Sequence, residues 1–67
     1  MNISASLYKE FEKQWNNGEF PHLRYGQAFY NHFNLHKCIQ KPWMHRLYNA
    51  DKDVAYRIVF SIVDWNN

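Results

Sequence analysis

The sequence predicts an all-α fold, a small bundle of three to four short helices that forms a single domain over residues 1–67. Three observations lead to this prediction. The chain has 67 residues, which is enough for one domain with a small core. Apolar residues recur at steps of three and four in several segments, which is the spacing of one helix face. Residues that start or stop helices separate these segments. The connections are short, so we expect neighbouring helices to pack on one another.

Composition limits how such a domain can be stabilised. A disulfide within the chain is excluded because Cys38 is the only cysteine, and a single thiol suits a reducing cytoplasm. Aromatic residues make up 19% of the chain, and each large ring buries roughly 150–250 Å². No apolar run follows a basic start, and none approaches the roughly 20 residues that span a bilayer. We therefore expect a soluble cytoplasmic protein with no signal peptide and no membrane segment.

The first segment, SASLYKEFEKQWNNG, predicts a helix over about residues 5–16. Its apolar face recurs at steps of four: Leu7, Phe11 and Trp15. Ser4 or Ser6 suits the N-cap, since a hydroxyl can accept a bond from a free N–H of the first turn. Asn17 and Gly18 form a good C-terminal stop.

The stretch RYGQAFYNHF, residues 24–33, follows Pro21 and predicts a second helix over about residues 22–33. Ala28, Phe29 and Phe33 supply the helical steps. Gly26 costs this helix about 1 kcal/mol relative to alanine. Two explanations offset that cost. Either another backbone approaches Gly26 closely, or the helix starts late and Gly26 lies in its first turn.

Two further helices are predicted in the second half of the chain. One is short and starts at Pro42, which suits a first helical turn. The other lies within DKDVAYRIVFSIVDW, residues 51–65, where Asp51 or Asp53 suits the N-terminus. Its many β-branched residues make a strand over 56–63 the competing interpretation. We expect the core of the bundle to be built around these residues: Leu7, Phe11, Trp15, Phe29, Phe33, Leu47, Ile58 and Ile62.

The residues of the second predicted helix carry a resemblance. Arg24, Gly26, Gln27, Ala28, Phe29 and Asn31 give the pattern R-x-G-Q-A-F-x-N, followed by a short helix and an apolar closing helix. This pattern resembles short uncharacterised proteins of enterobacteria and their prophages. The resemblance covers about two-thirds of the chain, and its specific part is ten residues long. It implies an all-α fold and a prophage or mobile-element setting, and it implies no activity.

Metal and catalytic interpretations find little support. His32 and His36 are spaced to reach one zinc ion from a single helix, with Cys38 nearby, but Leu35 and Lys37 suggest that the helix ends before His36. Cys38 beside Lys37 has no evident catalytic partner and is typical of a small apolar core residue. Asp51 and Asp53 suit helix capping better than acid–base chemistry. We expect no enzyme activity, no cofactor and no metal site.

Positive charge is concentrated in the middle of the chain. The net charge is only +2, yet no acid occurs between Glu19 and Asp51, a region that also holds all four histidines. Trp, Tyr, Met and Arg are enriched in protein interfaces, and the aromatic residues are too many for all to be buried in so small a domain. The candidate partner-binding residues are Arg24, Tyr25, Lys37, Lys41, Trp43, His45 and Arg46.

These observations favour a small non-enzymatic protein-binding module, encoded by a phage or mobile element, that inhibits or adapts a larger protein with an acidic surface. The alternative is a nucleic-acid-binding domain that uses the same basic aromatic residues. A helix-turn-helix is disfavoured because the link between 22–33 and 42–49 is too long. The apolar C-terminal helix also suits pairing with its own copy in a homodimer. RYGQAFYNHF itself is interpreted mainly as scaffold, with the basic loop after it as the contact surface.

Overall fold

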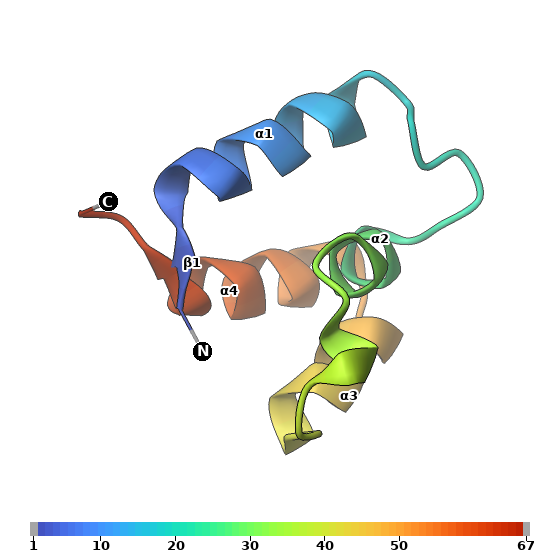
Figure 1. The fold of residues 1–67 in the computed structure, drawn as a ribbon. Coiled ribbons are helices and arrows are strands. Elements are labelled where there is room, and N and C mark those ends of the chain that lie inside the picture. Colours follow the sequence, from blue (N-terminus) through green and yellow to red (C-terminus); the bar gives the residue numbers. More distant parts are fainter. Residues whose placement is uncertain (1, 67) are drawn as a thin grey trace.

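The computed structural model describes residues 2–66, and it confirms an all-α fold for them (Figure 1). The only sheet in this range is a pair of two-residue strands. In chain order the elements are β1 (Ile3–Ser4), α1 (Ala5–Asn16), α2 (Tyr25–His32), the 3₁₀ turn η1 (Leu35–Lys37), α3 (Pro42–Asn49), α4 (Lys52–Ile62) and β2 (Val63–Asp64).

The first helix has the bounds predicted from its sequence, because both of its ends are set locally. Ser4 is the N-cap, and its hydroxyl accepts a bond from the Leu7 N–H at 3.3 Å. At the other end Gly18 takes a φ of +76°, a left-handed conformation that suits glycine after a helix.

The second helix is shorter than predicted. It begins at Tyr25 rather than near residue 22, because Pro21 and His22 form a turn and Arg24 is extended with a ψ of 158°. Gln27 Oε1 accepts a bond from the Arg24 N–H at 3.3 Å, which helps to fix the start of the helix. Asn34 follows the helix with a φ of +54°, and this left-handed residue separates α2 from η1.

The last two helices confirm the predictions made from their starts. Pro42 is the first residue of α3, and Asp51 occupies the N-cap position of α4. The competing strand over 56–63 is wrong, since residues through Ile62 are helical. Strand pairing is confined to the end of the segment, where Val63 lies opposite Ile3 and Asp64 opposite Ser4 in a parallel pair.

α2 is the helix that packs against each of the other three, α1, α3 and α4. In Figure 1, α1 and α4 run across the view one above the other, whereas α2 is seen nearly end-on. α3 lies below and packs against both α2 and α4. The parallel strands hold the two described ends of the chain on the same side of the molecule.

Phe11 is the centre of an aromatic core. Its ring is fully buried, and it meets rings from the α1–α2 connection, from α2 and from the turn after α2. These neighbours are Phe20, Tyr25, Phe29, His32 and Phe33, with ring centroids 5.3–6.0 Å from that of Phe11. Aromatic pairs of this geometry contribute about 0.5–1.5 kcal/mol each beyond the area they bury. The high aromatic content therefore supplies the core of this small domain.

The predicted core is partly correct. Phe11, Phe29 and Leu47 are buried, and Trp15, Phe33, Ile58 and Ile62 are half-buried against them. Leu7 was wrongly placed in the core, since half of its side chain (50%) is exposed. The buried face of α1 is turned by about one residue and holds Ala5, Tyr8 and Phe11. Tyr8 contacts the rings of Phe60 and Trp65, which come from the other end of the chain.

Gly26 is buried where α2 meets α3, and both explanations for this residue hold. It lies in the first turn of α2, and the backbone of α3 approaches it closely. A Cβ atom at this position would lie 2.0 Å from the Leu47 carbonyl oxygen and 3.0 Å from the Leu47 carbonyl carbon. No side chain fits in that space, so the two helices can cross at this distance only with glycine here.

A buried hydrogen-bond cluster joins α1 to α2. The Tyr25 hydroxyl donates to Glu12 Oε1 at 2.8 Å, and the Tyr8 hydroxyl donates to the same oxygen. Burial, followed by these bonds to the Glu12 carboxylate, raises the pKa of both tyrosines well above the usual value of 10.0. Burial also raises the pKa of Tyr56, whose ring packs on Tyr25.

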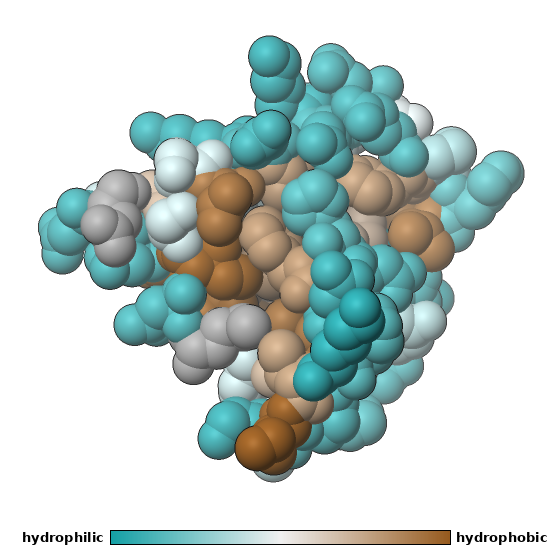
Figure 2. Space-filling model, in the orientation of Figure 1, coloured by the Kyte–Doolittle hydropathy of each residue, from teal (hydrophilic) through white to brown (hydrophobic). Residues whose placement is uncertain are grey.

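Apolar surface remains on the outside of the domain. Figure 2 shows apolar atoms between α1 and α4 near the chain ends, and a further apolar spot at the lower end where the segment leading into α3 lies. Within residues 2–66, no helix combines the length and apolarity needed to cross a bilayer.

Replacing Gly26 by alanine should largely unfold the domain. The new methyl group would overlap the Leu47 carbonyl, and we expect a loss of at least about 3 kcal/mol, at the upper end for overpacked sites. Domains of this size rarely have more than about 3–5 kcal/mol of stability. Urea unfolding followed by far-UV circular dichroism measures the change.

The matched control is Gly18→Ala, which meets open space and adds only left-handed strain of about 1–2 kcal/mol. A Gly26→Ala variant as stable as the Gly18→Ala variant would contradict the close approach of α2 and α3.

The tyrosine cluster predicts a loss of stability in alkali. Because the folded-state pKa values of Tyr8 and Tyr25 lie above the unfolded value of 10.0, their contribution is fully present below pH 10. It falls as the pH rises through the folded-state values, since the unfolded chain releases these protons first. Tyr25→Phe should lower the free energy of unfolding by about 1.5–3 kcal/mol at neutral pH. The variant should then lose less of its remaining stability than the wild type as the pH rises into the alkaline range. Urea unfolding between pH 7 and pH 11 tests this, and parallel curves for both proteins would refute it.

Candidate functional site

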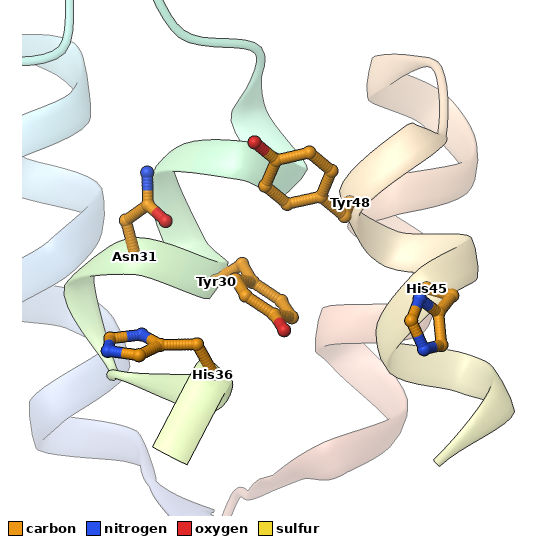
Figure 3. A pocket seen from close by; sticks show the side chains of 5 residues that line it. All are labelled: Tyr30, Asn31, His36, His45 and Tyr48. Atoms are coloured by element: carbon orange, nitrogen blue, oxygen red, sulfur yellow. The ribbon is translucent and has the colours of Figure 1, made fainter. Parts of the chain in front are cut away.

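A surface cavity of about 290 Å³ lies between α2 and α3. It is lined by Tyr30 and Asn31 from α2, His36 from η1, and His45 and Tyr48 from α3. Tyr30 stands in the middle, with Asn31 and His36 on one side and the two α3 residues on the other (Figure 3). Among the described residues, no carboxylate lines this cavity.

The walls of the cavity are held in place by contacts within the fold. The close approach at Gly26 and Leu47 sets how far apart α2 and α3 lie. Further along, the Tyr30 and Tyr48 rings meet edge to face, with centroids 5.2 Å apart and an interplanar angle of 76°. The cavity is therefore a preformed feature of the crossing between the two helices.

The loop from η1 to α3 is fixed by the side chain of Gln40. Its Nε2 donates to the carbonyl oxygens of Leu35 at 2.9 Å and Cys38 at 3.0 Å. Its Oε1 accepts a bond from the Tyr30 hydroxyl at 2.9 Å. One amide side chain thus ties the loop both to itself and to α2, at the edge of the cavity.

This fixed loop holds Ile39 out into solvent. The side chain of Ile39 is 87% exposed, more than any other large apolar side chain in residues 2–66. Lys37 and Lys41 flank it in sequence, and both are exposed. We call the surface formed by Ile39, its two lysines and the five residues that line the cavity the docking face.

The seven predicted contact residues differ in how exposed they are to solvent. Lys37, Lys41 and His45 are exposed on the docking face, and Arg24 is exposed at the start of α2. Arg46 is exposed on α3, but it lines a different hollow together with Asp51. Trp43 is half-buried against the core.

Tyr25 was wrongly predicted as a contact residue. It is only 2% exposed, and its hydroxyl is committed to Glu12. The hydrogen bond to Glu12, which lies 13 positions earlier in the sequence, holds the Tyr25 side chain in the interior. A partner protein therefore cannot contact this ring.

Sequence reasoning missed the most exposed apolar residue. Ile39 lies in a segment without helical periodicity, so no spacing pattern singles it out. The signal that could have found it is the arrangement of one aliphatic residue between two lysines, just before a proline that starts a helix. Gln40 could not have been identified in this way, because its role depends on carbonyl groups and a hydroxyl that only the fold brings to it.

A second apolar cluster lies at the other end of the domain. Phe60 and Trp65 are 49% and 51% exposed, and their rings meet each other and Tyr8 edge to face at 5.3–5.9 Å. Trp65 Nε1 also donates to the Phe60 carbonyl at 3.1 Å. The residues that suggested pairing through α4 mostly face inward, since Val59 and Val63 are buried and Ile58 and Ile62 are half-buried. A homodimer contact at this end of the domain would therefore rely on the exposed rings of Phe60 and Trp65.

His32, His36 and Cys38 are not arranged as a metal site in the described residues. α2 ends at His32, so His32 and His36 are not on one helix. His32 packs on Phe11 and Phe20, inside the aromatic core. In the described part of the chain, no group of three or more His, Cys, Asp and Glu side chains is arranged to hold a metal ion.

Comparisons of the chain with protein-family models, with curated proteins and with solved structures find no match. The resemblance to short enterobacterial and prophage proteins thus stays a prediction.

Removing the Gln40 side chain should free the loop while leaving the helices intact. In Gln40→Ala, we expect the Ile39 amide to lose order on the nanosecond timescale, because the bonds to Leu35, Cys38 and Tyr30 are gone. The measurement is the backbone ¹⁵N heteronuclear NOE. Asn49→Ala is the control, since it removes an amide bonded to the His45 carbonyl within α3. An unchanged NOE at Ile39 would show that Gln40 does not order the loop.

Proposed function

We propose that this protein is a small non-enzymatic binding domain that inserts Ile39 into an apolar pocket on a larger protein. Lysines and other cations around Ile39 would pair with an acidic rim on that partner. By occupying the partner's surface, the domain would act as its inhibitor or adaptor. The proposal includes a phage or mobile-element origin, as expected from the sequence pattern of α2.

The exposure of Ile39 is the observation that carries this proposal. An aliphatic side chain that is 87% exposed gains about 1.5–3 kcal/mol when a partner buries it. Most exposed apolar residues lie on helix faces and need no explanation. Ile39 differs because Gln40 fixes the loop that presents it. A loop already ordered before binding loses little conformational entropy when it docks.

The charge around Ile39 supports an acidic partner. Lys37 and Lys41 are exposed on either side of Ile39 in the sequence, and the sequence holds no acid between Glu19 and Asp51. Complementary charge speeds association and rejects wrong partners more than it adds affinity. We therefore expect the apolar contact to supply most of the affinity and the cations to supply selectivity.

Nucleic-acid binding is the second candidate, and the same run of positive charge favours it. Two features favour a protein instead. An apolar tip finds no pocket on a phosphate backbone, whereas proteins offer such pockets readily. The Tyr30 and Tyr48 rings also pack edge to face on each other, which leaves no pair of parallel faces between which a base could stack.

The test is a pull-down of tagged protein from bacterial lysate, with and without nuclease, read by mass spectrometry. We expect one protein in stoichiometric amount that survives nuclease and is lost with Ile39→Asp. The affinity of the domain for this captured protein should fall at least about 30-fold in Ile39→Asp, as for a binding hot spot. Lys41→Glu should weaken binding less and mainly slow association.

Two control variants make this test specific. Leu7→Asp changes another half-exposed aliphatic side chain on α1, and Lys13→Glu reverses an exposed lysine on the same helix. Both should bind normally, and all variants should keep the circular dichroism spectrum of the wild type. If Ile39→Asp retains the partner, the docking face is wrong. If recovery disappears with nuclease, nucleic-acid binding replaces the proposal.

A further inference from the structure

The cavity beside Ile39 has hydrogen-bonding groups without partners inside the protein. The Tyr30 hydroxyl already donates to Gln40. In contrast, the side chains of Asn31, His36, His45 and Tyr48 form no hydrogen bond with another group of residues 2–66. Each of these four side chains can donate a hydrogen bond, through an amide, an imidazole N–H or a hydroxyl.

We propose that this cavity binds a carboxylate, the side chain of an aspartate or glutamate on the partner. The inference rests on the proposed function and specifies what the partner places next to the pocket that receives Ile39. The partner would then present an acidic side chain at a fixed offset from an apolar pocket.

Donor chemistry favours a carboxylate over other groups. A carboxylate only accepts hydrogen bonds, and bonds to an ionised acceptor are roughly twice as strong as neutral ones. No carboxylate of the described chain lines the cavity to compete with it. The tyrosine rings in the lining offer apolar surface on which the methylene groups of a glutamate can pack, and a volume of about 290 Å³ accommodates the whole side chain.

The lining fits a phosphate less well. Phosphate sites in proteins rely on arginine forks, lysines or helix N-termini, and the lining contains neither arginine nor lysine. The exposed Lys37 directly follows the lining residue His36 in η1, so one lysine lies next to the lining in the chain. This lining suits one singly charged acceptor held by several hydrogen-bond donors.

The experiment titrates small probes into ¹⁵N- and ¹³C-labelled full-length protein and follows the Asn31 side-chain amide and the His36 and His45 rings by NMR. The probes are N-acetyl-glutamate amide, its neutral isostere N-acetyl-glutamine amide, inorganic phosphate and an oligothymidylate. We expect saturable shifts at the cavity with the glutamate probe and a Kd on the order of 10 mM, as befits so few atoms. The glutamine probe should bind about tenfold more weakly, since it lacks the charge.

The double variant His36→Ala/His45→Ala should abolish these shifts, and the unaltered pattern of other amides will show that it folds. His22→Ala is the matched control, because His22 is exposed in the connection between α1 and α2. Equal affinity for the glutamate and glutamine probes, or shifts that map to lysines instead, would overturn the carboxylate site. Tighter binding of phosphate or of the oligothymidylate at the cavity would overturn it in favour of a phosphate ligand. None of these outcomes changes the Ile39→Asp result, so failure of the cavity and failure of the docking face can be told apart.

Discussion

The contact between Gly26 and the Leu47 carbonyl is the constraint on which the rest of the structure depends. It lets α2 and α3 cross at a distance that any side chain would prevent. That crossing brings Tyr30 against Tyr48 and forms the cavity between the two helices. Tyr30 in turn holds Gln40, and Gln40 holds the loop that exposes Ile39. Glycine lowers the intrinsic helix stability of α2. In return, the close helix crossing that it permits leads to the ordered loop that exposes Ile39.

Features with local causes could be predicted from the sequence, whereas features with distant causes could not. The ends of α1 follow from Ser4 and Gly18, and the start of α3 follows from Pro42. Tyr8 rather than Leu7 is buried, and Tyr8 contacts Phe60 and Trp65 from the other end of the chain, which no spacing within α1 reveals.

The same distinction applies to the candidate site. The positive charge of the loop could be read from composition, and the exposed lysines followed from it. Tyr25 looked like a contact residue because its burial is caused by Glu12, on a different helix. The cavity assembles side chains from α2, η1 and α3, so no spacing along the chain reveals it. The sequence around Ile39 gives only a weak indication that this residue is exposed. The hydrogen bonds of Gln40, which fix the loop that presents Ile39, are visible only in the fold.

The parallel pairing of Ile3–Ser4 with Val63–Asp64 places the two described ends of the chain beside each other, on the side where α1 begins and α4 ends. A domain whose ends meet behaves as a closed unit: it can be spliced into a surface loop of another protein, or its ends can be joined and new ends opened elsewhere, without pulling the fold apart. The turn at Asn17–Gly18, where a side chain at Gly18 would meet open space, is a natural place for such an opening.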